Sequence, residues 1–356
     1  MPTISKVSLS GPAELLTVLP FHLGFRPTHS VVVACLHGPR LGLVARLDVP
    51  EPADAHRAAA QTVPTLVDQR PTSVLLVGFA DGPDTPADPR PLLDALRDGL
   101  EDAGVPVGER LVVRNGRWFG LDCGCCPPPG RPLPEAADVP AVAEYVATGR
   151  AVLGSRDALA RLVEPVSPDD PRHEPRLVAV EEWAQRRARG LLLDESLEAW
   201  VRLVRYGLDA EPSPRTVAAL VGPLVDTQVR DLLVSWLCRG FPGDHVPGEL
   251  SARLGRALES VDGPETDADT EPEPELETEL EPERLVLARL EQLCRAAPEA
   301  CAAPVLGVTA AYAWWTGDGA RGSVAADRAL LVDPEHGLAL LVREALGRGM
   351  RPPRCA

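Results

Sequence analysis

Residues 31–36 read VVVACL, and this run of β-branched and apolar side chains decides the fold class of the first part of the chain. A strand that is apolar on both faces is typical of a sheet covered on both sides. Residues 37–40 read HGPR, which is the chemistry of a turn, and strand character resumes over residues 41–49. The sequence therefore predicts a β-hairpin whose first strand is buried.

The segments around this hairpin alternate between helix and strand patterns. Residues 73–79 have the pattern of another buried strand, and residues 110–119 carry a strand pair divided by Asn115-Gly116, a strong hairpin-turn signal. Apolar residues recur at helical spacing in three segments: residues 11–20, 55–67 and 91–103. Strands separated by helices predict an α/β N-terminal domain, in which helices cover both faces of one mixed sheet.

Strand patterns fade after residue 130, and helical spacing dominates the rest of the chain. The expected helices are residues 139–148, 156–163, 177–189, 196–206, 216–237, 284–294, 305–315, 323–332 and 337–346. We therefore expect an α/β domain followed by an all-helical C-terminal part. The expected boundaries are residues 1–130 for the α/β domain, 131–258 for a helical region, 259–283 for an acidic linker and 284–356 for a closing helical unit.

The negative charge of the chain is concentrated in one segment. The whole chain has 356 residues and a formal charge of −16, from 36 basic and 52 acidic side chains. Residues 259–283 hold 12 of the acidic side chains and no lysine or arginine, and prolines such as Pro272 and Pro274 block a regular helix there. We interpret this segment as a disordered, solvated linker. The remainder, with 40 acidic and 36 basic side chains, lacks the basic surface that nucleic-acid binding requires.

Several enzyme classes are excluded by the near absence of lysine. Lys6 is the only lysine, so the chain contains no Gly-Lys-Ser/Thr triplet of a phosphate-binding loop and no lysine suited to a kinase or a Schiff-base enzyme. Residues 317–322 read GDGARG, which matches the Gly-x-Gly-x-x-Gly motif of dinucleotide-binding proteins. That motif needs a preceding strand, whereas residues 310–315 have a helical pattern, so we interpret these glycines as a turn between helices and predict no bound cofactor.

The scattered cysteines and the lack of long apolar stretches indicate the cellular compartment of the protein. Eight cysteines are scattered through a chain that has no leader pattern, which is typical of reduced thiols in the cytoplasm. No stretch approaches the ~18 apolar residues that a membrane-spanning helix requires. We therefore predict a cytoplasmic protein that does not enter a membrane.

The most unusual local segment is a turn containing Cys123, Cys125 and Cys126, which is followed by three prolines. A structural zinc site normally takes four ligands from two separated pairs. Here Asp122 or a distant histidine would have to complete such a site. Thiolate chemistry is the other option, although the spacing is not Cys-x-x-Cys. The sequence leaves three interpretations: a purely structural turn, a metal site for which zinc is the candidate, and a redox or nucleophilic thiol.

A second candidate is the loop that connects the first helix to the buried strand. It contains Arg26, His29 and Ser30, which are polar groups beside a sheet edge, where α/β proteins often bind ligands. The alternative is a plain connecting turn in which Ser30 satisfies backbone groups.

The closing helical unit has a partial repeat signature. Small or apolar residues precede Pro334 with the spacing of one tetratricopeptide repeat: Leu306, Ala310, Ala313, Gly322, Ala326 and Ala329. There is no second copy, and solenoids need about three repeats to bury a continuous core. An ordinary helix pair with small contact residues explains the same spacing.

Three groups of residues resemble an actinobacterial family that is catalogued as domain-of-unknown-function family 4192. The opening of that family is similar to residues 9–16 (LSGPAELL), 24–27 (GFRP) and 30–33 (SVVV). Its middle motif resembles residues 116–118 (GRW) followed by 125–128 (CCPP), and its end resembles residues 317–320 (GDGA), 326–330 (ADRAL) and 333–334 (DP). The resemblance implies membership over nearly the whole chain, and it implies no activity.

Two functional classes remain open from the sequence. The first is a cytoplasmic, non-catalytic binding or scaffold protein that uses its helical unit for a protein partner. The second is a metal- or thiol-dependent enzyme or redox sensor at Cys123, Cys125 and Cys126. The absence of the catalytic signatures considered above favours the first class.

Overall fold

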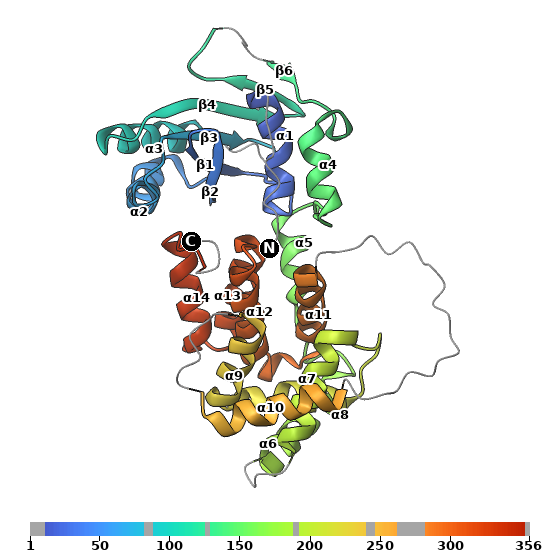
Figure 1. Ribbon diagram of the computed structural model, residues 1–356. Coiled ribbons are helices and arrows are strands. Elements are labelled where there is room, and N and C mark those ends of the chain that lie inside the picture. The colour runs from blue at the N-terminus through green and yellow to red at the C-terminus, as the bar shows by residue number, and fades with distance from the viewer. Residues whose placement is uncertain are drawn as a thin grey trace. The chain divides into compact units, whose positions relative to one another are not determined.

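The computed structural model describes residues 11–81, 88–124, 129–187, 192–239, 246–261 and 282–352 (Figure 1). The chain divides into two compact units. The first comprises Met1–Arg156 with Gly347–Gly349, and the second comprises Asp157–Leu346 with Met350–Ala356. The predicted fold class is confirmed, because the first unit is built on a sheet and the second is helical.

The α/β unit contains one mixed sheet. Its strands, in chain order, are β1 (Ser30–His37), β2 (Arg40–Asp48), β3 (Ser73–Phe79), β4 (Val107–Arg114), β5 (Arg117–Gly120) and β6 (Arg131–Pro132). The strand order across the sheet is β2-β1-β3-β4-β5-β6, and β3–β4 is the parallel pair among antiparallel neighbours. Asn115 and Gly116 connect β4 to β5 with φ values of 51° and 66°, which is the left-handed geometry that an Asn-Gly hairpin turn requires.

Helices cover both faces of this sheet, as predicted (Figure 1). One face carries α2 (Ala55–Asp68) and α3 (Arg90–Asp102), which enclose Val31, Val33 and Leu76 in the main core of the unit. The other face carries α1 (Pro12–Leu23) and α4 (Pro140–Ala147), which pack on each other. Helix α1 continues past Pro20, where the sequence pattern predicts its end, and stops at Gly24 with a left-handed φ of 78°.

The first hairpin contains a β-bulge, which determines the face of the sheet on which Leu41 lies. Ala34 of β1 pairs with Val44, but Leu36 pairs with Leu41, so β2 has one extra residue between these pairs. Such a β-bulge turns the following side chains to the other face of the sheet. Leu43 consequently packs with the α2–α3 core, while Leu41 shares the α1 face with Leu36.

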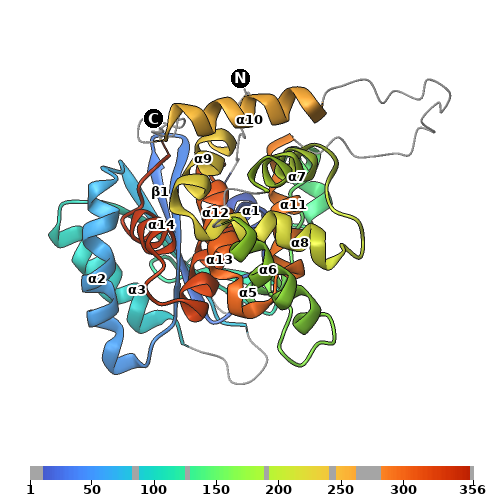
Figure 2. The ribbon, with the colours of Figure 1, turned by 90° about the horizontal axis from the view of Figure 1, so that it is seen from below.

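The second unit is a set of helices (Figure 2). These are α5 (Arg156–Ala160), α6 (His173–Arg187), α7 (Leu193–Tyr206), α8 (Pro214–Val221), α9 (Thr227–Leu237), α10 (Gly248–Val261), α11 (Pro282–Ala296), α12 (Ala303–Trp315), α13 (Gly319–Val332) and α14 (Gly337–Gly347). Helix α12 is buried around nearly its whole circumference and packs against α9, α11 and α13. An all-round apolar helix of this kind forms the centre of a helical core.

The sequence predicts one helix over residues 216–237, and the structure divides it. Helix α8 gives way to a 3-10 turn at Gly222–Val225 that contains Pro223. Asp226 then begins α9, because its carboxylate accepts the backbone N–H of Gln228 at 2.8 Å. Pro223, which lacks an N–H, and Asp226, which caps the next helix, together mark the start of a new helix. The leucine spacing runs through both helices without a break, so it predicts a single helix instead.

Gly317 lies between α12 and α13, as expected, whereas Gly319 begins α13 and Gly322 lies within it. Gly317 has a left-handed φ of 82° after α12, and the Asp318 carboxylate accepts the N–H of Arg321 to cap α13. The small residues of the repeat-like spacing lie at the contact between α12 and α13. A Cβ on Gly322 would lie 3.3 Å from the carbonyl oxygen of Ala310. The spacing therefore serves a close helix pair.

Residues 262–281, which are most of the predicted acidic linker, lie outside the described residues, so the disordered character of the linker stays a prediction. Within the described ranges, no helix combines the length and apolar character needed to cross a bilayer.

Candidate functional site

A cavity of about 380 Å³ lies in the α/β unit, between α1, α4 and the sheet. Leu15 and Val18 of α1 form one wall, and Leu36, Leu41 and Leu75 of β1, β2 and β3 form the opposite one. The β-bulge in the first hairpin therefore contributes directly to this cavity, because it turns Leu41 toward α1. The result is a mainly apolar chamber on one face of the sheet.

The cavity lies at the amino ends of the parallel strands β3 and β4. Val74 near the start of β3 and Gly108 near the start of β4 both line it, as does Gly11 just before α1. Ligands of open α/β sheets usually bind at the carboxyl ends of the strands. The ligand loop expected from the sequence, which lies beside a sheet edge and contains Arg26, His29 and Ser30, does not line this cavity.

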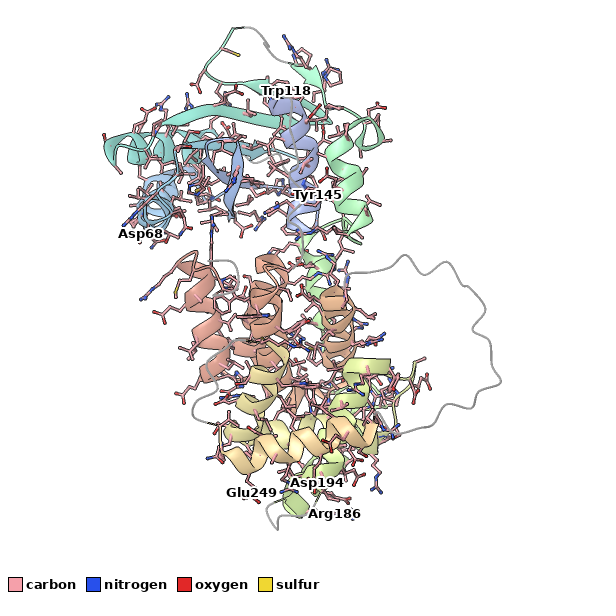
Figure 3. The ribbon with its side chains drawn as sticks, in the orientation of Figure 1. Asp68, Trp118, Tyr145, Arg186, Asp194 and Glu249 are labelled. Atoms are coloured by element: carbon pink, nitrogen blue, oxygen red, sulfur yellow. The ribbon has the colours of Figure 1, made fainter. Side chains whose placement is uncertain are left out.

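Two polar side chains line the cavity, and one of them is Tyr145 of α4 (Figure 3). Its hydroxyl lies 3.2 Å from Nδ1 of His22, and the guanidinium of Arg150 lies 5.5 Å from the ring centroid. Burial raises the pKa of Tyr145, so the phenol remains protonated at neutral pH. Tyr145 therefore presents a neutral aromatic wall whose polar end is already engaged.

The second polar lining residue is Glu109 of β4, which pairs with Leu75 of β3 in the parallel ladder. Side chains alternate across a strand, so Glu109 faces α1 whereas its neighbour Arg110 faces α3. Among the described residues that line the cavity, Glu109 is the only one with a formal charge.

The predicted ligand loop is placed at a strand junction. Arg26 is exposed, and its backbone N–H donates to the carbonyl oxygen of Leu153 at 2.9 Å. His29 has a left-handed φ of 43° and donates its N–H to the carbonyl oxygen of Asp81. Ser30 begins β1 and is fully buried, and its hydroxyl has no hydrogen-bond partner within the described ranges. None of the three lines the cavity, and their ligand role stays a prediction.

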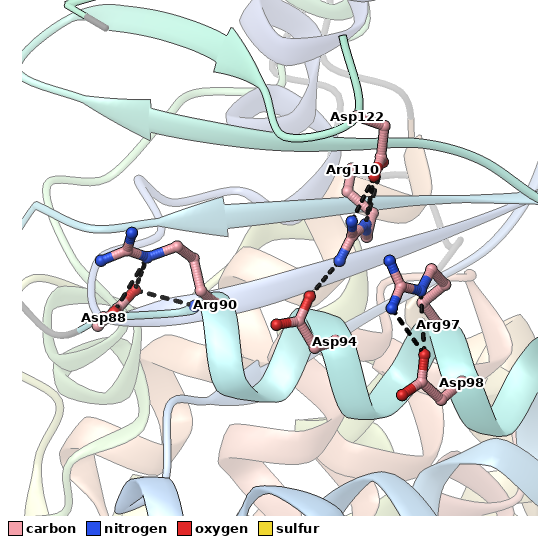
Figure 4. A network of polar contacts seen from close by, with 7 residues as sticks. All are labelled: Asp88, Arg90, Asp94, Arg97, Asp98, Arg110 and Asp122. Carbon is pink, nitrogen blue, oxygen red and sulfur yellow. Dashed lines mark hydrogen bonds and ion pairs between the residues drawn. The ribbon is translucent and has the colours of Figure 1, made fainter.

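The cysteine turn is described only in part. Cys123 is exposed just beyond β5, while Cys125 and Cys126 lie outside the described residues. Asp122, the predicted additional ligand, accepts from Nε of Arg110 at 3.1 and 3.0 Å through its two oxygens and also from Nη2 (Figure 4). This hydrogen bonding to Arg110 holds the pKa of Asp122 below its usual value. In the described part of the chain, no group of three histidine, cysteine or acidic side chains has the arrangement to hold a metal ion.

The guanidinium of Arg110 links its own strand, β4, to α3 and to the segment that follows β5. It is 6% exposed, and besides Asp122 it donates to Asp94 of α3 (Figure 4). A buried guanidinium needs such partners, because an unpaired charge inside a protein is costly. The network therefore fixes the segment that leads into the cysteine turn against α3. Sequence reasoning missed it because Asp94, Arg110 and Asp122 are far apart in the chain.

Replacing Arg110 with methionine is expected to lower the free energy of unfolding by about 1–2 kcal/mol. The loss is limited because the carboxylates of Asp94 and Asp122 are half exposed, so water can hydrate them when the guanidinium is removed. Arg90→Met is the matched control, because Arg90 pairs with Asp88 at the surface and its side chain is 65% exposed. Urea titration of both variants would check this. Equal unfolding midpoints for the two variants would contradict the buried role of Arg110.

The fold and the cavity together define a two-part protein, in which an α/β unit with a mixed sheet and an apolar chamber is joined to a helical unit. The chain belongs to the family described as Domain of unknown function (DUF4192), whose sequence profile matches residues 12–264 and 278–353. Comparison with curated proteins and with solved structures found no match.

Proposed function

We propose that this chain is a non-catalytic binding protein that holds a small, predominantly apolar molecule in the cavity between α1, α4 and the sheet. The single observation that carries the proposal is the cavity itself. Its volume of about 380 Å³ lies within the ~300–1,000 Å³ range of small-molecule sites, and its walls are mainly leucine and valine.

The composition of the wall supports binding over catalysis. Tyr145 is neutral and its hydroxyl already contacts His22, so it is poorly suited to accept a proton from a substrate. Glu109 is the other polar side chain in the lining, and no histidine, cysteine or serine accompanies it among the described lining residues. The Glu109 side chain is exposed to solvent, so the described lining offers no buried carboxylate for acid–base work.

A cytoplasmic location is part of the proposal. Burial raises the pKa values of Cys294 and Cys301 to about 12, so both thiols remain protonated and unreactive. Such thiols are compatible with a reducing compartment. The alternative of a metal- or thiol-dependent enzyme or redox sensor at Cys123, Cys125 and Cys126 stays a prediction from the sequence.

The proposal is tested with N-phenyl-1-naphthylamine, a neutral apolar dye that fluoresces when it leaves water. Wild-type protein is expected to bind the dye, and Leu41→Trp is expected to weaken binding at least about tenfold by filling the chamber. Leu43→Trp is the matched control, because Leu43 is equally half-buried in the same strand but packs on the opposite face.

Two results would overturn this function. One is dye binding that is equally strong in wild type and in Leu41→Trp. The other is dye binding only by a variant that begins at Gly11, since Gly11 lines the cavity and the preceding ten residues would then be its occupant. Circular dichroism of each variant verifies that the fold is retained.

A further inference from the structure

The cavity in the α/β unit reaches solvent at the amino ends of β3 and β4. Gly38 and Pro39, in the turn between β1 and β2, line the cavity and are exposed. Gly108 and Glu109, near the start of β4, also line it and are exposed. The two pairs lie along one edge of the sheet, since the backbone N–H of Gly38 donates to the hydroxyl of Thr72, just before β3. These four lining residues form the mouth of the cavity.

The walls away from the mouth are buried and apolar. Leu15 and Val18 of α1 are 8% and 1% exposed, and Leu75 of β3 is 6% exposed. Tyr145 marks the inner end, because its hydroxyl contacts His22, which lies about one helical turn beyond Val18. The lining therefore changes from solvent-exposed residues at the mouth to buried hydrocarbon inside.

The cavity is long for its volume. Gly11 and Val18 both line it, and at 1.5 Å per residue their separation corresponds to roughly 10 Å along α1. The volume of about 380 Å³ lies toward the lower end of the range for small-molecule sites. A small volume drawn out over this length suits one hydrocarbon chain better than a bulky ring system or a pair of chains.

Charges of both signs surround the mouth. Glu109 is one of the mouth residues, and Arg40, which follows Pro39, is also exposed. At the amino end of α1, the carboxylate of Glu14 has the opposite sign to the positive end of the helix dipole. Because the Glu109 and Arg40 side chains lie in water, salt screens both of them. The mouth therefore lets a polar group stay hydrated without selecting the sign of its charge.

We propose, on the premise that the cavity is a binding site, that its ligand is a single-chain alkyl amphiphile that enters tail first. The hydrocarbon chain lies between α1 and the sheet, in contact with Leu15, Leu36 and Leu75, and the polar head stays in water at the mouth. Burial of the chain supplies the affinity, because each methylene removed from water makes a similar contribution.

The shape of the ligand is tested by displacing N-phenyl-1-naphthylamine from the full chain with straight 1-alkanols, from butanol to dodecanol. Affinity is expected to rise about fourfold per added methylene. The rise should stop once the chain reaches the inner end beside Tyr145. Menthol, a compact ring alcohol that is no less apolar than 1-octanol, is expected to need at least about tenfold higher concentration than 1-octanol, because a ring overfills a narrow chamber.

The orientation of the ligand is tested with octylamine, 1-octanol and octanoate. The three are expected to displace the dye within about threefold of one another, because each head stays in water. Glu109→Lys makes both charged side chains at the mouth positive, so octanoate should then displace the dye at roughly threefold lower concentration than octylamine at low salt. Glu101→Lys is the matched control, because it makes the same charge change at an exposed position near the end of α3.

The outcomes separate the amphiphile from the binding function on which it depends. If the dye binds but menthol competes as well as 1-octanol, or affinity rises unbroken to dodecanol, the cavity binds ligands and the single-chain assignment is wrong. Discrimination among the three heads by more than about tenfold in wild type, or equal ratios in Glu109→Lys and Glu101→Lys, would show that the head is not at the mouth. If the wild-type protein does not bind the dye at all, the proposed function fails and the amphiphile falls with it.

Discussion

Replacing Trp200 with alanine is expected to lower the free energy of unfolding of the helical unit by about 3–5 kcal/mol. Trp200 of α7 is fully buried, and its indole N–H donates to the carbonyl oxygen of Leu220 in α8 at 2.9 Å. The substitution removes the largest fully buried side chain and leaves a cavity that the helices fill only partly. It also leaves the Leu220 carbonyl without its indole donor, which adds a desolvation cost.

The matched control for this variant is in the same helix. Tyr206 ends α7 and is 68% exposed, so Tyr206→Ala is expected to change stability by less than ~0.5 kcal/mol. Trp200→Phe keeps most of the volume but loses the hydrogen bond, and it should fall between the two. Urea unfolding followed by circular dichroism gives the three values. A Trp200→Ala midpoint close to that of Tyr206→Ala would show that α7 and α8 do not share a tight core.

Local signals explain why much of the fold could be predicted from the sequence. The run at residues 31–36 specifies a buried strand by composition alone, and Asn115-Gly116 specifies a turn because both residues must adopt positive φ values. The helical spacing of the second unit likewise depends only on neighbours a turn apart. Helix α10 could have been assigned in the same way, because Leu254, Ala257 and Val261 lie on one face.

The candidate site could not be predicted, because it depends on groups brought together from distant parts of the chain. The chamber requires one extra residue in β2, which turns Leu41 over relative to Leu43, and hydrophobic alternation alone does not reveal that shift. Conversely, Arg26, His29 and Ser30 are adjacent in sequence, but only Ser30 is fully buried and Arg26 is exposed.

Gly307 of α12 packs closely against His336, the residue just before α14. A Cβ at this position would lie 2.5 Å from Cε1 and 3.0 Å from Nδ1 of His336, well inside van der Waals contact. His336 is itself 7% exposed, and its Nδ1 accepts the backbone N–H of Ala339 at 3.3 Å, which caps the start of α14. The imidazole therefore has little room to retreat without giving up the cap.

Gly307→Ala is accordingly expected to destabilise the protein by about 2–3 kcal/mol, toward the upper end of the range for an overpacked core. Gly255→Ala in α10 is the matched control, because a Cβ there meets no atom within 4 Å. In an open helical position the same substitution is expected to stabilise by up to ~1 kcal/mol, since alanine loses less backbone entropy than glycine. Opposite shifts in the urea midpoint are thus expected from an identical change of one methyl group.

If both variants were stabilised, the contact between α12 and the start of α14 would be looser than the position of His336 implies. The double variant Gly307→Ala with His336→Ala isolates the cause, because removing the ring should recover the part of the loss that comes from the clash.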